Sequence, residues 1–146
     1  MASVFDVAHY VLERQGAMSA MKLQKLAYYS QAWSLVWDDV PLFDERIEAW
    51  ANGPVVRDLY MAHKGQFTVH HKLLGEKGSS ANLTNTQRET IDAVLDAYGK
   101  RSAQWLSDQT HAEAPWLNAR ENLPDNERGN AEITLASMAE YYSSLS

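Results

Sequence analysis

The chain has no cysteine among its 146 residues, which excludes disulfide bonds, thiolate nucleophiles and zinc sites built on thiolates. It also has no apolar stretch close to the roughly 20 residues that a membrane-spanning helix needs. The first six residues contain neither a basic segment nor a continuous apolar one, so the sequence predicts no signal peptide. We therefore expect a cytoplasmic protein with no membrane partner.

Familiar catalytic motifs are missing as well. The sequence contains no glycine-rich phosphate loop, no zinc-binding HExxH motif and no Gly-x-Ser-x-Gly nucleophile turn. His63, His70 and His71 are the best metal candidates because imidazole is a common ligand, but neighbouring side chains in an extended segment point apart. For His111 we favour a contact with the last carbonyls of a helix over catalysis. We predict no catalytic residue, no metal, no cofactor and no enzymatic activity.

Positive charge is scarce, with 13 basic against 19 acidic side chains and a net charge of −6. Residues 1–106 hold 11 basic and 12 acidic side chains, whereas residues 107–146 hold two basic and seven acidic ones. Because nucleic acids attract basic surfaces, we expect no nucleic-acid partner. The acidic C-terminal part favours either a solvated surface or a field that steers a basic partner.

Apolar periodicity predicts a mainly α-helical protein. Suitable caps are Ser3, Ser19, Thr84, Ser102 and Asn130. Helices are expected over residues 4–15, 19–37, 54–63, 84–98, 102–110 and 130–142, with one more turn at 115–117. Residues 64–83 read as a loop with room for a small hairpin, and the segment nearest to a linker is 122–128. We expect one domain over residues 1–146, a bundle of five to six helices with at most a minor β hairpin.

The helix over residues 19–37 is apolar on most sides, so we expect it at the centre of the core. Lys22 and Lys25 lie near its N-terminus, where the helix dipole disfavours cations. Either another group compensates them or their ammonium groups reach water.

Residues 47–51 alternate in polarity and predict a short strand, which ends at Asn52 and Gly53. Pro54 fits the first turn of the helix that follows, where its missing N–H costs nothing. The same region holds Trp50, Arg57 and Tyr60, which belong to the residue types enriched at interface hot spots. The alternative is that the two aromatic side chains belong to the core and Arg57 is an ordinary surface charge.

Taken together and in order, several motifs resemble one family, the Panacea domain, also called the SocA-like antitoxin or phage-associated GepA-like domain. The resemblance covers about residues 4–120. The motifs are Met21–Trp33, Pro41–Val56, Tyr98-Gly99, Leu106-Ser107, Thr110-His111 and Pro115-Trp116.

The resemblance implies the antitoxin of a type II toxin–antitoxin system, found in bacteria and prophages, that neutralises a protein toxin by direct contact. One family member delivers its toxin to a protease, so a protease or its unfoldase is a second expected partner. The surface expected to bind the toxin comprises Trp50, Asn52, Gly53, Pro54, Arg57 and Tyr60. Two alternatives stay open, a metal- or histidine-dependent hydrolase and a DNA-binding transcriptional regulator.

Overall fold

The computed structural model describes residues 1–145, which form eight α-helices, one short 3-10 helix and two antiparallel sheets of two strands each. The helices are α1 (Val4–Gln15), α2 (Ala20–Trp37), α3 (Arg57–His63), α4 (His71–Leu74), α5 (Asn85–Tyr98), α6 (Ala103–His111), α7 (Ala114–Arg120) and α8 (Leu135–Ser143). The strands are β1 (Met18–Ser19), β2 (Ile47–Trp50), β3 (Gly53–Val56) and β4 (Thr68–Val69), and the 3-10 helix is η1 (Ser80–Asn82). The predicted class, mainly α with a minor hairpin, is confirmed. No helix within residues 1–145 has both the length and the apolar composition to cross a membrane.

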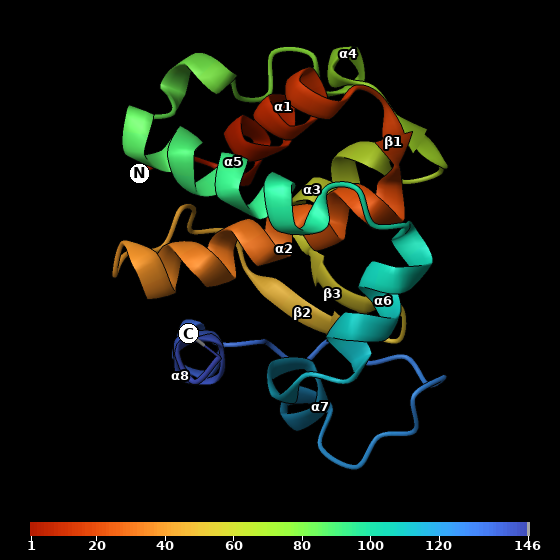
Figure 1. Cartoon of the computed structure of the whole chain (residues 1–146). Helices are drawn as coiled ribbons and strands as arrows, with labels where there is room; N and C mark the ends of the chain where they lie inside the picture. The colour runs from red at the N-terminus through yellow and green to blue at the C-terminus, as the bar shows by residue number, and fades with distance from the viewer. Residues whose placement is uncertain (146) are drawn as a thin grey trace.

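Helix α2 lies at the centre of the fold, as its sequence predicts (Figure 1). Every residue from Leu23 to Ala32 is buried. Helices α1, α5, α6 and α8 and strand β3 all pack against it. A helix covered on all sides must be apolar around most of its circumference, which explains the pattern of its sequence. The described residues contain more helices than the predicted five to six because α4 is added and the turn at Pro115 extends into α7.

Local capping signals predict the starts of four helices correctly. Ser3, Ser19, Thr84 and Ser102 are the N-cap residues of α1, α2, α5 and α6, and each side chain accepts a hydrogen bond from a backbone N–H of the first turn. These bonds satisfy donors that the helix itself leaves free.

The predicted helix start at Pro54 is wrong. Pro54 lies in β3, which pairs antiparallel with β2 so that it faces Ala49, and α3 begins only at Arg57. The minor hairpin of the fold is therefore β2–β3, with its turn at Ala51 and Asn52. The chain continues in extended form because two residues that follow the proline favour a strand.

Those residues are Val55 and Val56, whose branched side chains suit a pleated backbone. The side chain of Gln24 on α2 also binds the main chain of Val56 on both sides, accepting from its N–H at 2.8 Å and donating to its carbonyl at 3.3 Å. This long-range clamp keeps Val56 extended at the entry to α3.

The small hairpin suggested for residues 64–83 also does not form there. Val69 belongs to β4, whose partner is the distant β1. Helices α4 and η1 follow, and the carboxylate of Asp6 fixes the end of the segment. It accepts hydrogen bonds from the backbone N–H of Ser79 at 2.7 Å and the amide of Asn82 at 3.0 Å.

The last helix starts later than predicted, because Thr134 and not Asn130 provides its N-cap. Residues before it lie along the edge of β2, where the backbone groups of Ala131 and Ile133 form hydrogen bonds of 2.8 and 2.9 Å with the strand. Helix α8 then packs against α2 and α7. The C-terminal segment is thus attached to the same hairpin that carries the candidate site.

Candidate functional site

Trp50 and Tyr60 form the centre of the candidate site. Trp50 ends β2 and Tyr60 lies on α3, and their rings meet edge to face with centroids 4.8 Å apart and an interplanar angle of 67°. Trp50 Nε1 donates a hydrogen bond of 2.8 Å to Glu48, which orients the indole. Both aromatic residues are half-buried, so one side of each supports the fold and the other faces solvent.

The other predicted contact residues divide into two groups. Asn52 and Arg57 are exposed, whereas Gly53 and Pro54 are buried in the hairpin. Gly53 has φ = +112°, and a Cβ atom there would lie 2.7 Å from Cε of Lys25. Glycine is therefore required for the shape of the turn, and Gly53 and Pro54 serve as scaffold.

Two adjoining hollows of about 430 and 940 Å³ share Trp50, Tyr60, Lys64 and Asn130 in their linings. We call them together the Trp50 groove. Its lining in chain order is Glu48, Trp50, Ala51, Asn52, Arg57, Tyr60, Met61, Lys64, Asn126, Arg128, Gly129 and Asn130. The groove brings together all four of the predicted contact residues that are not scaffold.

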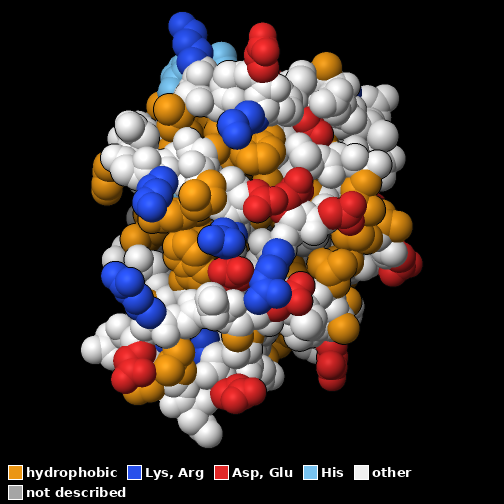
Figure 2. Space-filling model, turned by 180° about the vertical axis from the view of Figure 1, so that it is seen from behind, with side chains coloured by type: hydrophobic (Ala, Val, Ile, Leu, Met, Phe, Trp, Pro, Cys, Tyr) orange, Lys and Arg blue, Asp and Glu red, His pale blue; other side chains and the backbone are white. Residues whose placement is uncertain are grey.

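The groove is basic although the chain carries a net charge of −6. Arg57, Lys64 and Arg128 are exposed, and none of them belongs to an ion pair within residues 1–145. Glu48 is the one carboxylate in the lining; it is buried and already accepts a hydrogen bond of 3.0 Å from Arg46. Figure 2, the view from behind, shows Lys and Arg side chains beside exposed hydrophobic and acidic ones on that side of the molecule.

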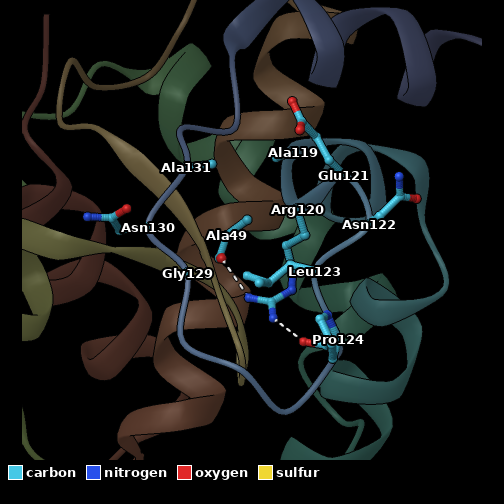
Figure 3. A pocket seen from close by; sticks show the side chains of 10 residues that line it. All are labelled: Ala49, Ala119, Arg120, Glu121, Asn122, Leu123, Pro124, Gly129, Asn130 and Ala131. Atoms are coloured by element: carbon cyan, nitrogen blue, oxygen red, sulfur yellow. Dashed lines mark hydrogen bonds between the residues drawn. The ribbon is translucent and has the colours of Figure 1, made fainter.

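The loop of residues 121–131 supplies part of the groove, and the sequence analysis did not find it. Arg120 holds this loop against β2: its guanidinium donates to the carbonyls of Ala49 at 3.1 Å, Pro124 at 2.7 Å and Glu127 at 2.6 Å. Figure 3 shows the guanidinium between strand and loop, beside a further hollow of about 560 Å³. A lone arginine at a helix end carries no sequence signal for such a role.

His111 holds the hairpin turn in place. Its Nε2 lies 2.9 Å from the carbonyl oxygen of Ala51, and its Nδ1 lies close to the carbonyl oxygen of Ser107 on α6. Each ring nitrogen therefore lies against a backbone carbonyl oxygen and is turned toward the protein. The predicted contact with carbonyls at the end of α6 is confirmed.

His63, His70 and His71, the best metal candidates in the sequence, are not placed together as a set of ligands in the described residues. His63 is buried, its Nε2 lies 3.0 Å from the amide nitrogen of Gln24, and burial lowers its pKa. A neutral ring that accepts this hydrogen bond fits that site. The rings of His70 and His71 pack on each other, with centroids 4.4 Å apart. Within residues 1–145, no three His, Asp or Glu side chains are placed to hold a metal ion.

Lys25 lies against Gly53, under the hairpin. It is 1% exposed and belongs to no ion pair among residues 1–145. Burial lowers its pKa from 10.5 to about 8. The Lys25 side chain is therefore almost fully withdrawn from solvent, and no carboxylate of the described residues lies within ion-pair distance of its ammonium group.

A buried carboxylate connects α8 to the core. Glu113 accepts hydrogen bonds from the hydroxyls of Tyr29 at 2.9 Å and Tyr142 at 2.7 Å, and from the amide of Gln109 at 3.1 Å. Burial raises the pKa of Glu113, and these hydrogen bonds offset part of that increase. The cluster fixes the end of the chain that returns from the groove.

Comparison with known proteins identifies the family. A family model described as "Antitoxin SocA-like, Panacea domain" matches residues 23–117, from α2 into α7. No curated protein and no solved structure gives a match. The matched residues include the hairpin and α3 but leave out the loop 121–131 and α8. Because they make up more than half of the 146 residues, the chain belongs to the SocA-like antitoxin family with a Panacea domain.

Proposed function

We propose that this chain is the antitoxin of a type II toxin–antitoxin system and neutralises a protein toxin by direct contact through the Trp50 groove. The observation that carries the proposal is a half-buried edge-to-face pair, Trp50 and Tyr60, in one groove with the unpaired guanidinium of Arg57. Trp, Tyr and Arg dominate the binding energy of protein interfaces, where each buried anchor contributes about 2 kcal/mol or more. Binding there covers the toxin's active or substrate-binding surface.

The first experiment pairs this chain with the product of the adjacent reading frame. We expect that product to stop growth when expressed alone, to be harmless when this chain is co-expressed, and to copurify with it. An adjacent product that still stops growth in the presence of this chain, with no complex recovered, contradicts the proposal.

The second experiment locates the contact surface. Arg57→Glu should leave the fold intact, because the side chain is exposed and unpaired, and should weaken toxin binding by about tenfold or more. Lys100→Glu, at an exposed lysine outside the groove, provides a control with the same charge change. Full protection by the folded Arg57→Glu variant would show that the toxin binds elsewhere.

We also propose that the complex can present the toxin to a protease or its unfoldase. This part rests on the family resemblance alone. It predicts that the toxin disappears faster after inhibition of protein synthesis when this chain is present, and that the difference vanishes in a strain lacking the protease.

The two other function classes have weaker support in the geometry. A histidine-dependent hydrolase needs a base that a substrate can reach, whereas both ring nitrogens of His111 lie against backbone carbonyls and His63 is buried against Gln24. A DNA-binding regulator needs an extended basic surface, whereas the net charge is −6 and the basic side chains of the groove surround an aromatic pair.

A further inference from the structure

The Trp50 groove has two sources in the sequence. One source is the hairpin, α3 and the residue after it, inside the part that matches the family; it supplies Trp50, Arg57, Tyr60 and Lys64. The segment 126–130 comes from the loop beyond residue 117. The groove is therefore completed by a part of the chain that the family match does not include.

The groove is basic, whereas the C-terminal part of the chain, residues 107–146, is acidic as a whole. Residues 107–146 contain seven acidic side chains and only two basic ones, Arg120 and Arg128. Arg120 is buried and binds backbone carbonyls, whereas Arg128 is exposed in the groove close to Lys64 in the same lining. An acidic partner is repelled by most of this surface and attracted at the groove, which selects one orientation of docking.

We propose that the Trp50 groove holds an acidic segment of the toxin, whose carboxylates lie at Arg57, Lys64 and Arg128 while an adjoining apolar side chain packs on Trp50 and Tyr60. This inference rests on the proposed function. Three unpaired cations around a half-buried aromatic pair match a segment of that composition. A nucleic acid would meet the same cations, but the net charge of −6 disfavours a polyphosphate chain.

The loop is ordered before any partner binds. Arg120 bonds the carbonyls of Pro124 and Glu127 in the loop and that of Ala49 on β2, and the backbone of Ala131 bonds the same strand. Because the loop is already ordered, less conformational entropy is lost when a partner binds. These bonds hold the backbone on both sides of Arg128 in the absence of a toxin.

The test uses two double variants with equal changes in net charge. Lys64→Glu with Arg128→Glu reverses two cations of the groove, and Lys72→Glu with Lys100→Glu reverses two exposed lysines outside it. None of these four side chains belongs to an ion pair within the described part of the chain, so all variants should fold. Binding to the purified toxic product of the adjacent reading frame is measured by calorimetry at low and high salt.

We expect the groove variant to bind at least about tenfold more weakly, with a smaller salt dependence, and the control variant to bind like the wild type. A photo-crosslinker at position 57 should attach to a toxin segment rich in Asp and Glu. Wild-type affinity in the groove variant, equal losses in both variants, or a crosslink to a second copy of this chain or to a segment without acidic residues would overturn the inference. If the wild type itself neither binds nor protects, the proposed function fails instead.

Discussion

Replacing Lys25 with methionine should raise the free energy of unfolding at neutral pH by up to about 3 kcal/mol. Lys25 is 1% exposed, and its ammonium group has no carboxylate partner in residues 1–145. Burial lowers its pKa from 10.5 to about 8. One pKa unit corresponds to about 1.4 kcal/mol, so the lowering measures a cost of about 3 kcal/mol for keeping the charge inside the fold. Methionine fills similar volume without that charge.

The cost should depend on pH with a definite sign. Below about pH 8 both the native and the unfolded chain carry the Lys25 proton, so the full penalty applies. Between about pH 8 and 10.5 the native protein loses this proton first, and wild-type stability rises with pH. Urea unfolding of wild type and Lys25→Met at pH values on both sides of this window measures the difference, which should be largest near pH 7 and shrink toward pH 10.5.

Lys100→Met, at an exposed site, controls for the removal of a lysine as such and should show no such pH-dependent difference. If Lys25→Met is less stable than the wild type at neutral pH, the ammonium group is held by interactions that outweigh its burial, and the reasoning is refuted. A difference between the two proteins that stays constant with pH would refute it equally.

Three further stability predictions follow from the same geometry. Gly53→Ala should cost about 1–3 kcal/mol in urea unfolding, because φ = +112° is strained for alanine and its Cβ would meet the buried lysine; Gly65→Ala, with φ = +85° and open space, should cost less. Tyr142→Phe removes the hydroxyl that donates to Glu113 and should cost about 1–3 kcal/mol, seen as a lower Tm, whereas an unchanged Tm would contradict the role of this bond. Since burial lowers the pKa of His63, the unfolded chain takes up this proton first as the pH falls through 6.5. Wild type should therefore lose stability there relative to His63→Leu, and parallel pH curves would show that the ring does not contribute.

Local signals are the part of the fold that the sequence predicts well. The caps at Ser19 and Thr84 and the apolar surface of α2 depend on residues within a few positions of one another, so their spacing is enough. The structure at Pro54 could not be predicted in this way, because the local sequence fits both a helix start and a strand. The choice is made by Gln24, which binds Val56 from 32 positions away.

The candidate site divides in the same way. Trp50 and Tyr60 are close enough in sequence for their contact to be expected, and the hairpin brings them together. The contribution of the loop 121–131 depends instead on Arg120 and Ala131 reaching Ala49, which lies more than 70 positions earlier. No periodicity or motif within the loop predicts its hydrogen bonds with Ala49.

The loop 121–131 is held almost entirely through backbone groups, which leaves its side chains free to differ. Arg120 binds three backbone carbonyls, Arg46 binds the carbonyl of Asn130, and Ala131 bonds to β2 through its own backbone. None of these bonds uses the side chains at positions 126, 128 and 130, which line the groove. Because exposed side chains without structural contacts contribute within about 0.5 kcal/mol to stability, they can be exchanged with little effect on the fold. The fold of residues 23–117 can then stay the same while the loop changes the charge and shape of the groove.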